Sequence, residues 1–127
     1  MKEIIKTDKA PAAVGPYSQA IKVAAGTAVY CSMQIALDPK ETRIVGATAA
    51  DQMEQCLKNL QAVLTAAEAD LKHVVKTTIY LTNIADFVAV NDVYGRYFTM
   101  DMPARAAIEV SRLPKDAKAA IEAVAVI

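Results

Sequence analysis

The residues best suited to chemistry lie in the apolar run MPARAAIEV, residues 102–110, which holds a single cation, Arg105. The alternation typical of a β-strand divides this run between two faces, with Ala104, Ala106, Ile108 and Val110 on one and Arg105, Ala107 and Glu109 on the other. A planar guanidinium binds a carboxylate or a phosphate through two parallel hydrogen bonds. Arg105 is therefore a candidate anion-binding residue, although the pattern alone favours a structural ion pair with a carboxylate of the protein itself, because most ion pairs in proteins are structural.

Size and composition indicate one small domain, residues 1–127, with more apolar surface than one copy buries easily. The chain is 54% hydrophobic and its mean hydropathy is +0.23, yet no apolar run approaches the length of about 18 residues that spans a membrane. We therefore expect a soluble protein that associates with further copies. Fourteen basic residues balance fourteen acidic ones, so no overall field attracts nucleic acid or an anionic membrane.

Cysteine and histidine usage gives no basis for a metal site. Cys31 and Cys56 lack CxxC spacing and no signal-peptide pattern opens the chain, so we expect a reduced, cytoplasmic protein without a structural disulfide. The single histidine, His73, lies in a polar stretch before a predicted strand. We expect neither a metal nor a cofactor.

Changes of periodicity predict the elements that must position Arg105. Strand-like alternation is predicted at residues 2–6, 18–24, 27–33, 74–81, 104–110 and 119–126. Helical periodicity runs from Thr48 to Ala67 and over about three turns from Asp86. We expect 18–24 and 27–33 to form a hairpin, and Asp38-Pro39-Lys40 to form a turn. The order β-β-β-α-β-α-β-β predicts a single α+β domain.

The helix ends and apolar stripes refine this prediction. Thr48, with Asp51 three residues on, resembles an N-cap, and Asp86 is expected to cap the second helix. The residues expected to be buried are Met53, Cys56, Leu57, Leu60, Val63, Leu64 and Ala67 in the first helix, and Phe87, Val90, Tyr94, Tyr97 and Phe98 in the second. Because residues 119–126 are apolar on both faces, we expect helices on one side of the sheet and another subunit on the other.

Three motifs resemble those of the RidA family of reactive-intermediate deaminases. Members carry a run of the type PARSCxEVxRLPKD, which residues 103–116 match, and the motifs GPYSQA (15–20) and VKTTIYL (75–81) match as well. The resemblance spans essentially the whole chain. It implies the chorismate-mutase-like fold, a mixed six-stranded sheet with two helices packed on one face. It also implies a homotrimer around a central barrel, with a ligand cleft at each subunit interface.

The resemblance further implies hydrolytic deamination of 2-imino and enamine acids, such as 2-iminobutanoate and 2-iminopropanoate, to 2-keto acids and ammonia. Water attacks such a C=N bond readily, so a catalyst mainly holds the carboxylate, orients the water and stabilises charge. Similarity assigns the carboxylate to Arg105 and places Tyr17 in the cleft, both as catalytic candidates. Asn91 and main-chain donors at Met33 and Ala107 are the further substrate-binding candidates.

The chain departs from the family pattern at several of these positions. Met33 stands where the family has glycine and Ala107 where it has cysteine. Ala120 replaces a glutamate that is thought to position the attacking water, a task for which a methyl group is unsuited. Glu122, about 6.6 Å further along the strand, is a candidate secondary acid or base, or else an interface ion-pair residue.

Two functions therefore stand open on the sequence. One is a deaminase of 2-imino acids anchored by Arg105, running at a reduced rate with water from bulk solvent. The other is a non-catalytic sensor or partner protein that binds a keto acid in the same cleft. Tyr17 and Asn91 also have plain structural interpretations, as a half-buried aromatic and a surface helix residue. Zero net charge and the lack of an aromatic-basic run argue against nucleic-acid cleavage, which has been associated with relatives.

Overall fold

The computed structural model describes residues 2–127 and confirms the predicted order of strands and helices. Short 3-10 turns at Leu71–His73, Ile84–Asp86 and Pro114–Asp116 precede β4, α2 and β6. The strands are β1 (Lys2–Ile5), β2 (Ala20–Val23), β3 (Ala28–Gln34), β4 (Val74–Leu81), β5 (Ala104–Glu109) and β6 (Ala119–Val126), and the helices are α1 (Ala49–Ala66) and α2 (Phe87–Tyr97).

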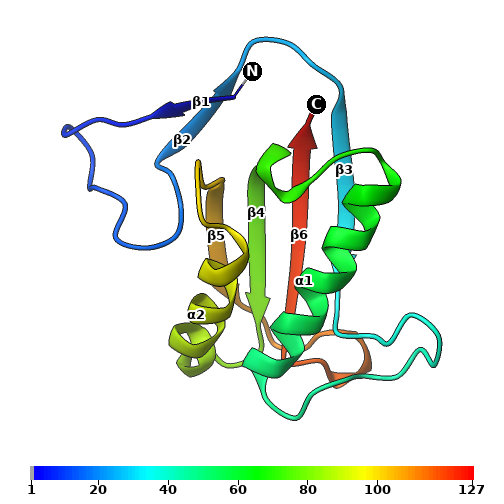
Figure 1. Cartoon of the computed structure of the whole chain (residues 1–127). Coiled ribbons are helices and arrows are strands. Elements are labelled where there is room, and N and C mark those ends of the chain that lie inside the picture. The colour runs from blue at the N-terminus through cyan, green and yellow to red at the C-terminus, as the bar shows by residue number, and fades with distance from the viewer. Residues whose placement is uncertain (1) are drawn as a thin grey trace.

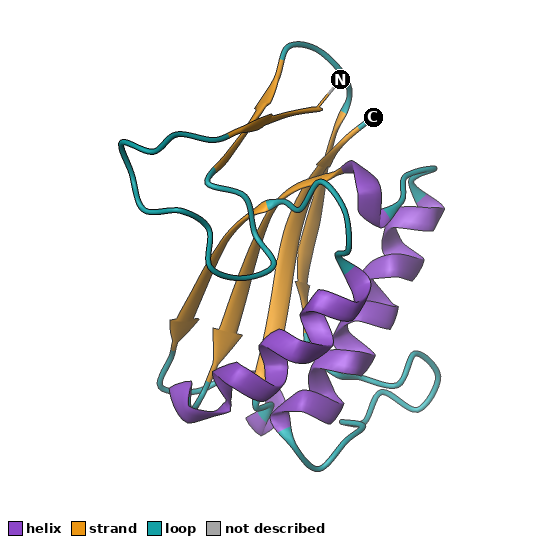
Figure 2. Cartoon of the chain, turned by 60° about the vertical axis from the view of Figure 1, so that its left-hand side comes forward, coloured by secondary structure: helices purple, strands orange, loops and turns teal. Residues whose placement is uncertain are grey.

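Four strands form the main sheet in the order β3-β6-β4-β5, and both helices lie on one of its faces (Figures 1 and 2). β6 pairs antiparallel with β3 and with β4, whereas β4 and β5 run parallel because α2 connects them as a crossover. The sheet is therefore mixed, with β3 and β5 at its edges. The place of β6 between two partners, with the helices on one side, fits its apolar character on both faces.

The N-terminal strands differ from the prediction. β2 pairs antiparallel with β1, so the expected hairpin between residues 18–24 and 27–33 is wrong. The two strands form a small sheet of their own, and the prediction of one six-stranded sheet is therefore also wrong. The reason lies at the start of β3, where Thr27 exchanges two backbone hydrogen bonds with Ile127, at 2.6 and 2.9 Å. This long-range pairing draws the chain into the main sheet and away from β2.

The main core lies between the helices and the sheet. Its fully buried side chains include Met53, Cys56, Leu57, Leu60 and Leu64 of α1, Val90 and Tyr94 of α2, and Ile79, Leu81 and Ile121 of the sheet. The apolar stripe predicted for α1 is thus confirmed, except that Val63 is 38% exposed and Ala67 only half-buried. In α2, Phe87 and Tyr97 are half-buried rather than buried.

The two helices begin differently. Thr48 caps α1 as predicted, because its hydroxyl accepts a hydrogen bond from the Asp51 N–H at 3.1 Å. Asp86 stands at the N-cap position of α2 but its side chain makes no capping hydrogen bond, so the predicted capping role is wrong. The helical segment already begins with the 3-10 turn Ile84–Asp86, which Asn83 caps by accepting from the Ala85 N–H at 3.0 Å.

The face of the sheet without helices carries a smaller apolar cluster. Leu113, Ala117 and Ala120 are its buried members, and Met33, Ile35, Ile44, Tyr80 and Val110 surround them. On the same face Tyr30 is 80% exposed and Ile108 is 44% exposed. This face is therefore less completely covered within one copy of the chain.

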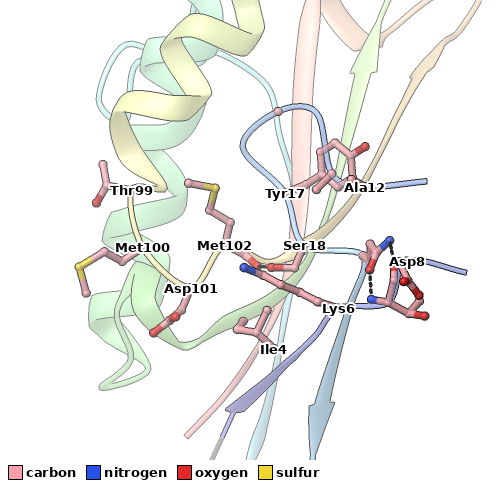
Figure 3. Close-up of a pocket in the computed structure, with 14 residues that line it drawn as sticks. Ile4, Lys6, Asp8, Ala12, Tyr17, Ser18, Thr99, Met100, Asp101 and Met102 are labelled. Carbon is pink, nitrogen blue, oxygen red and sulfur yellow. Dashed lines mark hydrogen bonds between the residues drawn. The ribbon is translucent and has the colours of Figure 1, made fainter. Parts of the chain in front are cut away.

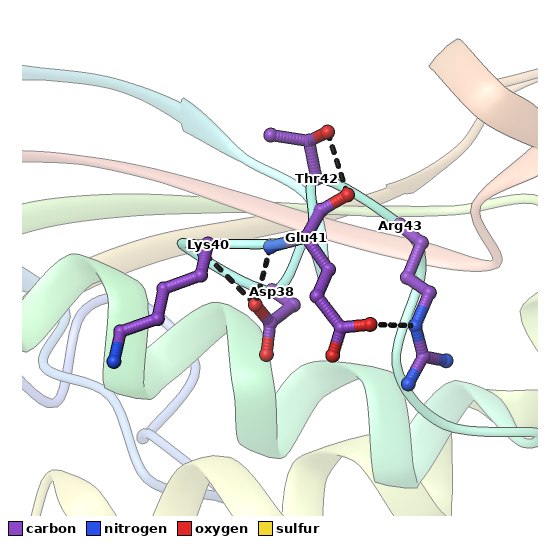
Figure 4. A network of polar contacts seen from close by, with 5 residues as sticks. All are labelled: Asp38, Lys40, Glu41, Thr42 and Arg43. Atoms are coloured by element: carbon purple, nitrogen blue, oxygen red, sulfur yellow. Dashed lines mark hydrogen bonds and ion pairs between the residues drawn. The ribbon is translucent and has the colours of Figure 1, made fainter.

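The predicted turn after β3 is present, and its first residue closes it (Figure 4). Asp38 Oδ1 accepts hydrogen bonds from the backbone N–H groups of Glu41 at 2.7 Å and Lys40 at 2.8 Å, and these bonds lower the pKa of the Asp38 carboxyl. Arg43 and Glu41 form an exposed ion pair at 3.0 Å. Exposed pairs of this kind contribute little to stability, so the turn is shaped mainly by Asp38.

Candidate functional site

Arg105 lies on the helix-covered face of the edge strand β5, opposite Thr77 of β4. Its Nη1 donates a hydrogen bond to Asn91 Oδ1 of α2, at 2.7 Å. Within residues 2–127, no carboxylate lies at ion-pair distance from this guanidinium. The structural ion pair that the sequence left open is therefore absent from the described chain.

Three aromatic rings surround the guanidinium. Arg105 Cζ lies 4.8 Å from the ring centroid of Tyr94, 5.3 Å from that of Tyr17 and 5.5 Å from that of Phe87. Burial lowers the pKa of Arg105, while Tyr94 and Tyr17 raise it, and arginine stays protonated in either case. Ring faces stabilise a cation without accepting its in-plane N–H groups. The rings therefore leave the N–H groups of the guanidinium that do not bind Asn91 without an acidic partner within residues 2–127.

The loop that carries Tyr17 is tied down at both ends. The Ser18 N–H donates to Pro103 O at 3.0 Å and the Ser18 hydroxyl donates to Met102 O, which fixes the loop to the start of β5. Gln19 holds the other end, accepting from the Thr7 N–H at 2.7 Å and donating to Pro11 O at 2.6 Å. These polar residues of the GPYSQA motif therefore serve the position of the loop.

Gly15 brings bare backbone against the same site. A Cβ at this position would lie 3.7 Å from Arg105 Nη2, 3.8 Å from Asn91 Nδ2 and 3.8 Å from the Tyr17 ring. Any larger side chain would extend into the space beside the guanidinium. Arg105, Tyr17 and Asn91, all predicted from the sequence, are thus brought together from three separate segments.

The remaining predicted residues are placed differently. Ala107 follows Arg105 on the same face of β5, where it packs against the main core. Met33 lies at the end of the opposite edge strand β3 and packs into the cluster on the helix-free face. The two edge strands are three strand spacings apart, about 14 Å. One copy of the chain therefore does not bring Met33 to Arg105.

Glu122 lies on the opposite face of the sheet from Arg105. Thr77, the neighbour of Arg105, pairs with Ala123, whereas Glu122 pairs with Thr78, and adjacent residues of a strand face opposite ways. The Tyr80 hydroxyl donates a hydrogen bond to Glu122 Oε1. Ala120, on the same face as Glu122, is fully buried by its apolar neighbours.

Sequence reasoning missed the residues that enclose Arg105 from α2. It assigned Phe87 and Tyr94 to the buried set without recognising that their rings contact the guanidinium. Their spacing with Asn91, at i, i+4 and i+7, was the available signal, since these positions share one face of a helix. Thr77 was read only as part of a strand.

A hollow of about 710 Å³ is lined in part by Tyr17 (Figure 3). It is formed between the N-terminal segment, including Ile4, Lys6 and Asp8, and the residues 99–102 that follow α2. Gly15 and Tyr17 line it, but Arg105 does not. The GPYSQA loop therefore borders both this hollow and the arginine site.

The other side chains that could be reactive, those of two cysteines and one histidine, are buried or hydrogen-bonded within the fold. Cys31 and Cys56 are buried and free, and burial raises the pKa of both thiols, that of Cys56 to about 12. Protonated, buried thiols are poor nucleophiles. His73 Nδ1 accepts a hydrogen bond from the Asp70 N–H at 3.0 Å and closes the 3-10 turn before β4.

Residues 2–127 contain neither a metal-binding cluster nor a membrane-spanning helix. No group of three or more His, Cys, Asp or Glu side chains there is arranged to hold a metal ion. No helix in that range has the length and apolar character needed to cross a membrane.

The fold and the site define a small α+β protein with an arginine-based candidate anion site. Residues 7–127 match the family described as Endoribonuclease L-PSP, and the chain belongs to this family, which confirms its assignment to the RidA proteins. It is 45% identical over 126 residues to the human 2-iminobutanoate/2-iminopropanoate deaminase, covering 99% of this chain and 90% of the human protein. RidA from the Antarctic bacterium Psychrobacter sp. PAMC 21119 superposes with a TM-score of 0.77 at 41% identity, covering 98% and 99% of the two chains. E. coli TdcF with bound serine superposes with a TM-score of 0.75 at 38% identity, covering 98% of each chain.

Proposed function

We propose that the protein is a hydrolytic deaminase of 2-imino and enamine acids, such as 2-iminobutanoate and 2-iminopropanoate, with Arg105 as the carboxylate-binding residue. The observation that carries this proposal is a half-buried guanidinium whose contacts within residues 2–127 are to Asn91 and three ring faces. A 2-imino acid presents a planar carboxylate that matches its free N–H edge. The name of the human relative supplies the reaction class.

The chemistry asked of the site is modest. With the carboxylate held by Arg105, water adds to the C=N carbon, and the resulting carbinolamine loses ammonia to leave the 2-keto acid. Positioning supplies much of the gain in such a reaction. Tyr17 limits the space on one side of the guanidinium and so orients the substrate chain.

We further propose that a second copy completes the cleft, in a homotrimer with the chorismate-mutase-like fold. Met33 and Arg105 lie on opposite edges of the sheet, about 14 Å apart, so both contact one ligand only where β3 of one copy meets β5 of another. The exposed Tyr30 and Ile108 on the helix-free face support such an assembly. Light scattering tests it, and a monomer at micromolar concentration contradicts it.

The residues available to position the attacking water bear on whether the protein is a slow deaminase or only binds a keto acid. Ala120 has no polar side-chain atom, and Glu122 is already hydrogen-bonded by Tyr80. The deaminase therefore runs more slowly than relatives that carry a glutamate at the position of Ala120. The same observation favours, as the second candidate, a non-catalytic protein that binds a small keto acid at Arg105.

A coupled assay of 2-iminobutanoate breakdown separates these functions. Arg105→Ala is expected to lower the rate by about 100-fold, since charge-assisted hydrogen bonds contribute up to about 3 kcal/mol. Arg105→Lys is the matched control, because it keeps the charge but lacks the paired N–H groups. Ala120→Glu is expected to raise the rate. A parent rate equal to background, together with measurable 2-oxobutanoate binding, would favour the binding protein.

A further inference from the structure

A hydrogen bond between two buried hydroxyls joins α2 to β4 beside the arginine site. Tyr94 Oη and Thr77 Oγ1 are 2.8 Å apart, and both residues are 0% exposed. Each hydroxyl has lost its contact with water and is satisfied by the other. The position of the tyrosine ring is therefore set by a specific polar contact as well as by apolar packing.

The same ring is the aromatic neighbour nearest to the guanidinium. Its centroid lies 4.8 Å from Arg105 Cζ, and the ring stacks on Phe98 with 4.5 Å between centroids. Thr77, which anchors the hydroxyl, is also the residue directly opposite Arg105 in the parallel pairing of β4 with β5. Strand register thus places the anchor and the cation on neighbouring strands, with the tyrosine ring against both.

We infer that Tyr94 and Thr77 are positioning residues for Arg105. Thr77 fixes the position of the Tyr94 ring by holding its hydroxyl, and the ring fixes the plane of the guanidinium so that its paired N–H groups face the incoming carboxylate. The inference rests on the proposed function for the identity of the anion, but the ordering of Arg105 by the ring does not require it.

The chemistry of the tyrosine suits this role. Burial raises the pKa of Tyr94 to about 12, so its hydroxyl stays protonated and the side chain stays neutral near neutral pH. A phenolate beside Arg105 would act as a built-in counterion and compete with the ligand. A neutral ring face stabilises the cation and leaves the N–H groups available.

Four variants test the inference. Tyr94→Leu removes the ring, Thr77→Val removes the anchoring hydroxyl, and Thr77→Ser restores that hydroxyl. Tyr97→Phe is the control, because Tyr97 lies on the same helix and donates its hydrogen bond to Glu54, away from Arg105. If Tyr94→Leu fails to fold, the comparison of Thr77→Val with Thr77→Ser still decides the question.

The first measurement needs no ligand. In a ¹⁵N-labelled protein, the Arg105 side-chain Nε–H signal is expected to be shifted by the ring current of Tyr94. This shift should be lost in Tyr94→Leu, reduced in Thr77→Val, and kept in Thr77→Ser and Tyr97→Phe. An unchanged Arg105 signal in both Tyr94→Leu and Thr77→Val would overturn the inference.

The second measurement compares the calorimetric affinities for 2-oxobutanoate and 2-oxobutanamide, which lacks the carboxylate. Preference for the acid should fall about tenfold in Tyr94→Leu, fall less in Thr77→Val, and recover in Thr77→Ser. An unchanged preference, with only the melting temperature lowered, would show a purely structural role and overturn the inference. Failure of the parent protein both to hydrolyse 2-iminobutanoate and to bind 2-oxobutanoate would refute the proposed function, while the Nε–H signal would still decide the ordering of Arg105.

Discussion

Arg105 and Glu122, on opposite faces of the main sheet, are held in different ways. On the helix-covered face, Arg105 contacts the neutral Asn91 amide and three aromatic rings. On the other face, Glu122 already accepts a hydrogen bond from Tyr80. A cation held by neutral groups keeps its capacity for an anion, whereas a carboxylate with a bound donor has part of its capacity used. The contrast shows why the arginine, rather than the glutamate, marks the candidate site.

The two faces also differ in packing. The helices bury a continuous core on one side, while the other carries a small cluster bordered by exposed Tyr30 and Ile108. The site thus rests on the part of the protein that is rigidly packed within one copy. The other face has only a small buried cluster within one copy of the chain.

The largest expected effect compares equivalent truncations on the two faces. Ile79→Ala removes a fully buried side chain and should lower the free energy of unfolding by about 3 kcal/mol. Ile108→Ala, at a position 44% exposed, should cost less than about 1 kcal/mol. Urea unfolding at several protein concentrations measures both. If the loss of unfolding free energy in Ile108→Ala grows with protein concentration until it equals the loss in Ile79→Ala, assembly buries Ile108 as well.

Alkaline pH offers a second test of the packed face. Because burial raises the folded-state pKa of Tyr94 to about 12, the folded protein keeps a proton that the unfolded chain loses near pH 10. The contribution is complete below pH 10 and is lost as the pH rises towards 12. It amounts to about 3 kcal/mol at most. Unfolding free energies of the parent and Tyr94→Phe should differ in slope above pH 10, and parallel curves would contradict the assignment.

Sequence patterns were sufficient where local periodicity decides the structure. The stripe of α1 and the alternation of β5 were read correctly, so Arg105 was placed on the same face as Ala107. The pairing of β2 was missed because Thr27 pairs with Ile127 from the far end of the chain, a contact that no local pattern contains. The role of Tyr94 was missed for a related reason. Periodicity showed that it is buried, but only the packing of α2 on β4 and β5 shows against which residue.

A variant at Asn91 tests the contrast directly, because it occupies the guanidinium of Arg105 as Tyr80 occupies the carboxylate of Glu122. Asn91→Asp places a carboxylate beside the Arg105 guanidinium and should convert their hydrogen bond into an internal ion pair. We expect the affinity for 2-oxobutanoate to fall by more than tenfold, because the new carboxylate competes with the ligand. Asn91→Ala, the matched control, should cost about fivefold, corresponding to one hydrogen bond. Isothermal calorimetry measures both, and a weaker effect of aspartate than of alanine would contradict the role of an unpaired cation.

The smallest expected effect concerns Glu122. The pKa of Tyr80 is raised, chiefly by its hydrogen bond to Glu122, so Glu122→Gln should return the Tyr80 pKa towards its ordinary value. Ultraviolet titration of tyrosinate detects this change, with Tyr80→Phe as the control that removes the titration step. Because Glu122 lies on the face opposite Arg105, the affinity for 2-oxobutanoate should be unchanged. A deamination rate lost at unchanged affinity would instead mean that Glu122 reaches the arginine site of a second copy, and the two faces would then meet across the subunit interface.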